Sequence, residues 1–191
     1  HTQGVVETTL KGTIEHVVTD PTWKITLAVE PLKLSALKPD LPPGTVWGKL
    51  ATQGALQSFT VSGEVHADSP EFGKATAHLD SDINDKRVRI TSLAVEPEGS
   101  ETKLTATGEW YWNDDPQHFD ISGQWRQLTW PLGAEAPKWG SPDGRFRVAG
   151  TPDKYELDLK GALAGRNLPS SKVNVQGVGS KREFKVGAVD V

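Results

Sequence analysis

Few side chains in this sequence have the spacing that catalysis or metal binding would require. Asp114, Asp115 and His118 form a short acidic and histidine cluster, but Asn113 and Pro116 beside them predict a turn instead of a metal or catalytic site. The five histidines show no metal-ligand spacing; they are His1, His16, His66, His78 and His118. No nucleophile elbow, phosphate loop, zinc motif or distinctive carboxylate pair occurs. We therefore expect no catalytic residue, no metal and no cofactor, so the chain is not expected to be an enzyme.

One run of aromatic residues could bind a ligand instead of packing in a core. Trp110, Tyr111 and Trp112 follow one another and could form a platform on which sugars stack. In a strand, however, Tyr111 points away from its two neighbours, so at most one face is aromatic. A carbohydrate-binding β-sandwich, in which Trp110 or Trp139 contacts sugar, is therefore the least favoured function.

The composition of the chain argues against several classes of protein. The 191 residues include 21 Lys and Arg against 25 Asp and Glu, a net charge of −4, so no basic field indicates nucleic-acid binding. Cysteine is absent, which excludes disulfides and thiolate chemistry. No apolar run approaches the roughly 20 residues that span a bilayer, and no signal peptide is visible. We expect the chain to be a piece of a longer protein.

Strand periodicity runs through almost the whole chain. Trp23, Ile25, Leu27 and Val29 alternate with polar residues, as residues 155–163 do later. The alternation slips by one residue after positions 29, 90, 125 and 186, which predicts a bulge or bend there. Short helical or turn segments are expected only at residues 34–38 and 131–136, a loop at 38–44 and a polar turn at 80–86. The chain is therefore predicted to be all-β.

The pattern repeats at a spacing of about 96 residues. Trp23 matches Phe119, and glycines 12, 48 and 54 match glycines 108, 144 and 150. We expect residues 1–191 to form one continuous segment with repeat units at about 9–103 and 105–191, since long-period repeats are typical of stacked architectures. Two duplicated β-sandwich domains are the alternative.

Alternation assigns the apolar residues to one face. An elongated, curled antiparallel sheet, open and solenoid-like, would line a hydrophobic groove with them and turn polar side chains such as Lys24, Glu156 and Asp158 outward. About 12 strands at 4.8 Å spacing would give a trough of roughly 55 Å. The candidate groove-lining residues are Trp23, Ile25, Leu27, Val29, Phe59, Val61, Val65, Val88, Ile90, Leu104, Phe119, Ile121, Trp125, Tyr155, Leu157, Leu159, Leu163, Phe184 and Val186.

Three phrases carry a family resemblance. They are WRQLTWPL at 125–132, SPDGRFRVAGTPDKYELDLKGALAG at 141–165 and NLPSSKVNVQGVGS at 167–180. In this order they resemble the repeats of the TamB or AsmA-like family of the Gram-negative envelope, whereas the first copy keeps Gly48 but lacks the aligned Ser and Pro. The resemblance implies a folded-over β-sheet, called a β-taco, in an internal periplasmic segment of a protein anchored in the inner membrane.

The resemblance also implies a function and partners. A TamB-like bridge protein is expected to shield phospholipid acyl chains in its groove between inner and outer membrane, and to work with a TamA-like outer-membrane barrel in the translocation and assembly module. The alternative is a scaffold or chaperone-like surface that offers strand edges to outer-membrane proteins during their assembly or autotransporter secretion.

Overall fold

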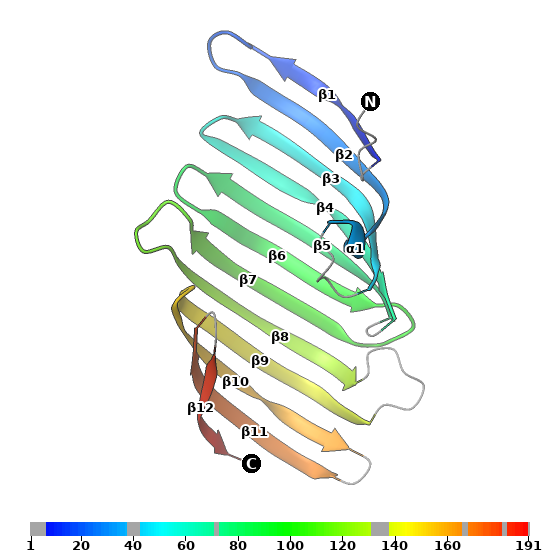
Figure 1. Cartoon of the computed structure of the whole chain (residues 1–191), viewed down its shortest axis with the longest axis vertical. Helices are drawn as coiled ribbons and strands as arrows, with labels where there is room; N and C mark the ends of the chain where they lie inside the picture. The colour runs from blue at the N-terminus through cyan, green and yellow to red at the C-terminus, as the bar shows by residue number, and fades with distance from the viewer. Residues whose placement is uncertain are drawn as a thin grey trace.

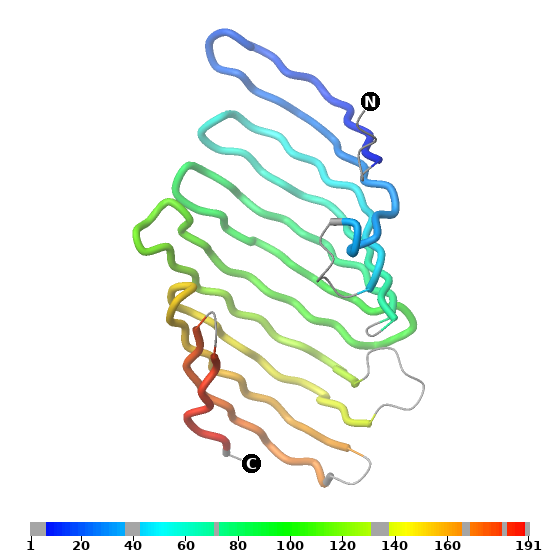
Figure 2. The backbone as a smooth tube through the Cα atoms, viewed as in Figure 1, coloured from blue at the N-terminus to red at the C-terminus, as the bar shows by residue number. Residues whose placement is uncertain are grey.

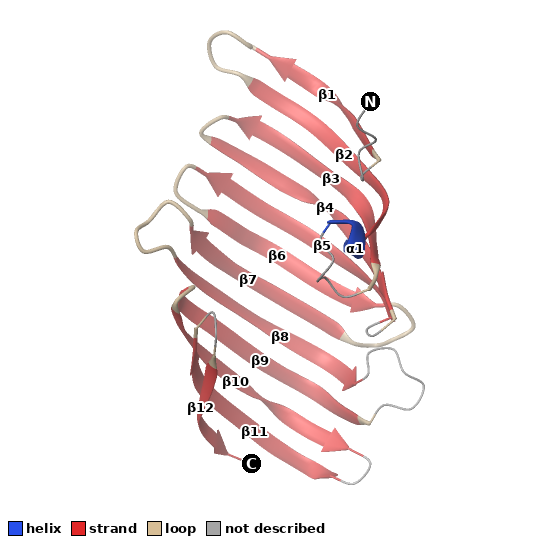
Figure 3. Ribbon diagram, viewed as in Figure 1, coloured by secondary structure: helices blue, strands red, loops and turns tan. Residues whose placement is uncertain are grey.

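The chain forms one antiparallel sheet of twelve strands. The computed structural model describes residues 7–37, 43–70, 73–130, 138–165, 168–180 and 183–190. The strands are β1 (Thr8–Glu15), β2 (Thr22–Lys33), β3 (Thr45–Ala55), β4 (Ser58–Ser69), β5 (Gly73–Asn84), β6 (Val88–Pro97), β7 (Lys103–Tyr111), β8 (His118–Trp130), β9 (Trp139–Thr151), β10 (Lys154–Gly165), β11 (Leu168–Gly179) and β12 (Phe184–Asp190). The short helix α1 (Leu34–Leu37) lies between β2 and β3 (Figure 3).

Strand order in space follows strand order in the sequence. Each strand pairs with the next, from β1 at one edge to β12 at the other, and the sheet curls without closing (Figure 1). The backbone therefore forms consecutive hairpins that lie side by side along the long axis, and the two termini lie toward opposite ends of this axis (Figure 2). The predicted all-β, curled, open antiparallel sheet is confirmed.

The alternative of two separate β-sandwich domains is wrong. Strands β6 and β7, which would belong to different domains, pair through residues such as Ile90 with Gly108 and Val95 with Leu104. The hydrogen-bonded ladder consequently crosses the expected junction without a break.

One predicted turn is a strand. Residues 80–86 were expected to turn the chain because they are polar, yet β5 continues to Asn84. Asp80 and Asp82 face outward with the other charged residues, while Ser81 is buried and donates a hydrogen bond to the Val61 carbonyl. Alternation continues through this stretch, and only the turn chemistry of residues 84–87 ends it. The helix expected at residues 34–38 is present as α1, whereas residues 131–136 and 38–42 lie outside the described residues.

The predicted phase slips coincide with irregularities of the ladder. Register shifts occur between Val29 and Leu32 on β2 and between Ile90 and Leu93 on β6. On β8 the slip is made by Gln127, whose φ of 48° lies in the left-handed region. Each device lets the apolar side chains stay on one face while the strand bends.

Strand positions follow the predicted spacing. Strands β2 and β8 begin at Thr22 and His118, 96 residues apart, and β6 and β12 begin at Val88 and Phe184, again 96 apart. The spacing is compatible with a six-strand unit, and the repeat itself stays a prediction.

The sheet has almost no conventional core. Among the described hydrophobic residues, only Ala106 and Trp125 are buried. The accessible surface is 13212 Å², against about 8900 Å² for a compact monomer of this mass. The apolar side chains are therefore shielded mainly by neighbours within one layer, and much of their surface remains available.

Candidate functional site: the apolar face of the sheet

The strand register places the predicted groove residues on one face. Side chains of directly opposed residues lie on the same side of an antiparallel sheet, so register pairs can be followed from strand to strand. One row crosses all twelve strands through Ile14, Trp23, Gly54, Phe59, Ile83, Val88, Trp110, Phe119, Gly150, Tyr155, Gly179 and Phe184. Every member is apolar, aromatic or glycine.

Three further rows run parallel to the first. The second is Gly12, Ile25, Thr52, Val61, Ser81, Ile90, Gly108, Ile121, Val148, Leu157, Gly177 and Val186. The third is Leu10, Leu27, Leu50, Gly63, Leu79, Leu93, Ala106, Gly123, Phe146, Leu159, Val175 and Val189. The fourth runs from β1 to β11 as Thr8, Val29, Gly48, Val65, Ala77, Val95, Leu104, Trp125, Gly144, Gly161 and Val173. We call these four rows the apolar face.

The apolar face contains every predicted lining residue except Leu163. That residue pairs with Ser171 beside the register shift of β10, at the margin of the rows. The prediction missed members that share the same alternation, among them Leu50, Ile83, Phe146 and Val148. Their common signal was the periodicity, but only the register shows that they continue the same rows.

Two glycines in the first row allow aromatic rings to meet. Trp23 and Phe59 have ring centroids 5.5 Å apart across Gly54, whose φ is +148°. Phe119 and Tyr155 repeat the arrangement at 6.3 Å across Gly150, with φ +138°. A side chain at either glycine would need an unfavourable φ and would contact the opposite strand. The aromatic pairs therefore cover backbone that would otherwise be open.

Trp125 is the best-buried large side chain of the apolar face, at 7% exposed. Its indole N–H donates to Ser141 Oγ at 2.7 Å, and the Ser141 hydroxyl contacts the Ala162 carbonyl. The indole ring lies over Gly144 and Gly161, so a Cβ at either position would collide with it. Three strands are thus joined where β8 changes phase.

Small residues on this face make room for neighbouring rings. In the structure a Cβ at Gly123 would lie 2.6 Å from the Phe146 ring, and one at Gly177 would meet Phe184. This space is accordingly occupied by the protein itself.

Exposure rises toward the two edges of the sheet. On β1, Leu10 is 65% and Ile14 is 58% exposed, while on β12 Val186 and Val189 are each 54% exposed. Both strands have only one neighbour among the described strands. The apolar face therefore continues onto both outermost described strands.

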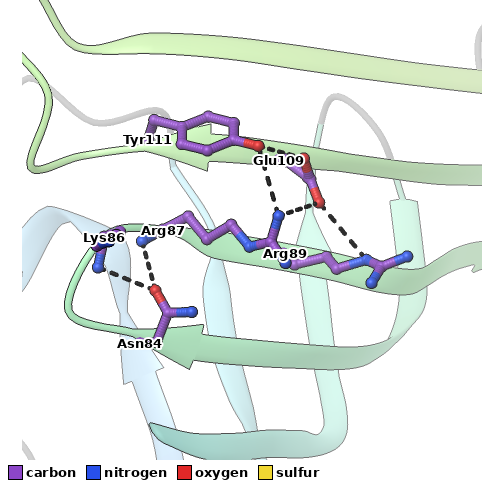
Figure 4. Close-up of polar contacts among 6 residues, drawn as sticks. All are labelled: Asn84, Lys86, Arg87, Arg89, Glu109 and Tyr111. Carbon is purple, nitrogen blue, oxygen red and sulfur yellow. Dashed lines mark hydrogen bonds and ion pairs between the residues drawn. The ribbon is translucent and has the colours of Figure 1, made fainter. Parts of the chain in front are cut away.

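The opposite face carries the charges, and we call it the polar face. Arg87 Nη1 donates to Glu109 Oε1 at 3.0 Å, and Arg89 reaches the same oxygen at 3.6 Å (Figure 4). The Tyr111 hydroxyl bonds to Arg87 and Glu109. The hydrogen bond with Tyr111 and the charge of Glu109 raise the pKa of Arg87. These contacts join β6 to β7 on the side away from the apolar rows.

Two other cross-strand pairs support this face. Arg147 forms a two-point ion pair with Asp120, and its hydrogen bonding lowers the pKa of the Asp120 carboxyl. Lys103 lies 2.6 Å from Glu96 and lowers the pKa of Glu96 in the same way. The side chains of Lys103, Asp120 and Arg147 are each more than half exposed, and that of Glu96 is 45% exposed. Each pair consequently holds two strands in register more than it stabilises a core.

Hollows in the surface belong mainly to the polar face. Four of them, of about 540, 560, 720 and 830 Å³, are bordered chiefly by side chains that point away from the apolar rows. Glu64 lies in one, 2.7 Å from His66 and 3.4 Å from His78. The predicted apolar groove is not among these hollows and stays a prediction.

The acidic and histidine cluster of the sequence is a turn. Residues 112–117 connect β7 to β8, with Asp114 3.4 Å from His118 and the His118 ring stacked on Tyr111. No group of three or more potential metal ligands occurs among the described residues. Nor does the described part of the chain contain a helix of the length and apolarity needed to cross a membrane.

Comparison with known proteins gives one family. Residues 113–191 match the model of the TamB N-terminal domain, a stretch that contains β8 to β12 and all three phrases noted in the sequence. No curated protein and no solved structure shows significant similarity to the chain. The match confirms the resemblance inferred from the sequence: residues 113–191, which are 79 of the 191 residues, are similar to the envelope-associated TamB-like family.

Proposed function

We propose that the apolar face shields phospholipid acyl chains as they pass between the inner and outer membrane. The observation that carries the proposal is the set of four apolar rows, three of which cross all twelve strands. Twelve strands at about 4.8 Å spacing extend for roughly 55 Å, longer than an acyl chain. Each methylene removed from water contributes about 0.8 kcal/mol, so a lipid tail could be held without polar contacts.

Continuity of the rows favours movement along the sheet. The described face has no charged side chain in the four rows, and its few polar members are Thr8, Thr52 and Ser81. Burial of acyl chains depends on area and not on direction, so a lipid could move from strand to strand without breaking specific bonds. The proposed setting is a periplasmic segment of an inner-membrane-anchored bridge protein that works with a TamA-like barrel.

The lipid content of the purified protein tests this proposal. Organic extracts of the wild-type chain are expected to contain phospholipid by mass spectrometry, whereas a Leu157→Glu variant should lose most of it because a carboxylate would lie in the second row. Glu156→Gln alters the adjacent residue of β10 on the polar face and serves as the control. Extracts without lipid, or equal lipid in the wild type and in a folded Leu157→Glu variant, would contradict the proposal.

The exposure of the two outermost described strands supports a second candidate function. Strand β1 is exposed along its whole length, and β12 exposes Phe184, Val186 and Val189. An outer-membrane protein could add a strand to such an edge during assembly or secretion. Under this proposal the chain acts as a scaffold, and its specificity comes from backbone pairing.

Leu157→Glu also separates the two functions. The substitution lies on β10, inside the sheet, and leaves the backbone edges of β1 and β12 unchanged. Loss of lipid with retained crosslinking of β12 to client protein would assign the client function to the edge. Crosslinks confined to lipid, with none to protein at either edge, would exclude the scaffold.

A further inference from the structure

Cationic side chains gather on the polar face of β8 to β11. Arg126, Arg145, Lys160 and Lys172 line one hollow of about 830 Å³, together with a single carboxylate, Asp143. These strands thus place four positive charges around a shared space. The hollow is also bordered by Trp125, Gly144, Gly161 and Val173 of the fourth apolar row, whereas its charged side chains come from the polar face.

The register puts like charges directly opposite each other. Arg145 faces Lys160 across the β9–β10 pair, and Lys103 faces Arg126 across the β7–β8 pair. Directly opposed like charges destabilise a sheet. Elsewhere on the polar face most opposed charges are of opposite sign, such as Lys49 with Glu64 and Asp158 with Arg147. The like-charged pair there, Glu109 with Asp120, is acidic. A local excess of cations is therefore a departure from the pattern of this face.

The cations of the hollow are poorly neutralised from within. Lys160 lies 3.4 Å from Asp158, and Lys103 is engaged by Glu96. Arg126, Arg145 and Lys172 form no ion pair within the described part of the chain, even though Asp143 lies opposite Arg126 in the register. Three cationic groups thus remain available to an anion.

A second observation in the same hollow concerns an acceptor. Asn174 lies opposite Lys160, and its side-chain oxygen is buried without a hydrogen-bond partner among the described residues. An acceptor without a partner carries a cost that a donor would remove, and a rotation of the Asn174 side chain would present this oxygen to the hollow. A ligand that combines an anion with a neighbouring hydroxyl or ammonium group would use both features.

We propose that this hollow binds a phosphate ester that carries such a donor. Arginine guanidinium groups match phosphate oxygens in a two-point geometry, and lysines add point charges. The same chemistry occurs in the headgroup of an anionic bilayer and in a soluble phosphate ester such as glycerol 3-phosphate. The proposal does not depend on lipid binding at the apolar face.

Binding of the full 191-residue chain to two probes tests the proposal. One probe is a vesicle of phosphatidylglycerol mixed into phosphatidylcholine, followed by co-sedimentation, and the other is glycerol 3-phosphate, followed by calorimetry. We expect the double variant Arg126→Gln, Arg145→Gln to weaken binding about 30-fold, since each cation near an anionic surface contributes roughly a fivefold factor. Binding to vesicles alone assigns the site to a headgroup, and binding to glycerol 3-phosphate assigns it to a soluble ester.

A matched control removes the effect of net charge. Lys24→Gln with Lys49→Gln deletes two cations from the polar face of β2 and β3, and neither lysine forms an ion pair in the described part of the chain. This control should bind like the wild type. Equal weakening in the two double variants would overturn the proposal. It would also be overturned if the wild-type protein bound no glycerol 3-phosphate and bound the mixed vesicles no better than pure phosphatidylcholine vesicles.

A single substitution keeps the test valid if the double variant fails to fold. Lys172 is exposed on β11, so Lys172→Gln should leave the far-UV circular dichroism spectrum unchanged. Its expected effect is about a fivefold loss of binding. An unchanged affinity in this folded variant would count against the hollow.

Discussion

Different interactions join neighbouring strands on the two faces of the sheet. On the apolar face, neighbouring strands contact through rings and aliphatic side chains, and Trp125 over Gly144 is the tightest example. On the polar face they contact through exposed ion pairs such as Arg147 with Asp120. One face gains stability by removing area from water, while the other mainly fixes register.

This difference shows how a single layer can be an ordered structure. A globular domain would cover the apolar face with a second layer, but here only Ala106 and Trp125 are buried among the described hydrophobic residues. The sheet consequently retains apolar surface of the kind that marks binding sites in other proteins. Substitutions on the two faces should therefore differ in size, and the following predictions measure that difference.

The largest effect is expected at the centre of the apolar face. Trp125→Ala should lower the free energy of unfolding by about 3–5 kcal/mol, because it removes a buried ring and leaves space over two glycines. Trp110→Ala is the matched control, since Trp110 is 44% exposed on the same face, and it should cost only about 1 kcal/mol. Urea unfolding followed by circular dichroism measures both values. Equal losses would mean that burial at Trp125 does not organise the sheet.

An intermediate effect is expected from adding volume on each face. Gly123→Val would force the Phe146 ring to move and should cost about 1–3 kcal/mol. Ala149→Val adds volume to the polar face of the neighbouring strand β9 and should change stability by less than about 0.5 kcal/mol. Thermal unfolding of the two variants gives the comparison. A polar-face variant as unstable as Gly123→Val would remove the distinction between the faces.

The smallest effect is expected at an ion pair. Asp120→Asn removes the partner of Arg147 and should shift Tm by no more than about 2 °C, because both side chains are exposed. Arg147 lowers the pKa of Asp120, so the pair stabilises the wild type above the ordinary carboxyl pKa. This contribution is lost as the pH falls through the lowered pKa of the folded state.

The pH dependence of Tm separates wild type from variant at this site. The difference in Tm between wild type and Asp120→Asn should be present at pH 7 and should shrink as the pH falls below about 4. A difference that is constant over this range would show that the pair contributes through packing instead of charge.

Much of the fold could be predicted because each strand follows a strict period of two. Alternation around Trp23 and Phe119 gave the strands and their apolar sides, and the phase slips gave the irregularities on β2 and β6. Residues 80–84 form a strand instead of the predicted turn, because polarity alone does not end a strand. Ser81 occupies an inward position, where its hydroxyl bonds to a backbone carbonyl.

Contacts that depend on register could not be predicted. The pairing of Arg147 with Asp120 joins residues 27 positions apart, and the indole of Trp125 reaches Ser141 across a strand pair. Neither separation carries a signal in a single sequence. The cationic hollow was missed for the same reason, because Arg126, Arg145 and Lys172 come from three different strands.

Photo-crosslinking along β10 tests the central claim most directly, because its residues alternate between the two faces. Crosslinkers at Leu157 and Leu159 lie on the apolar face, and those at Glu156 and Asp158 lie on the polar face of the same strand. Irradiation in cells is expected to capture phospholipid at the first pair and little or none at the second. Equal labelling of the two pairs would contradict the account.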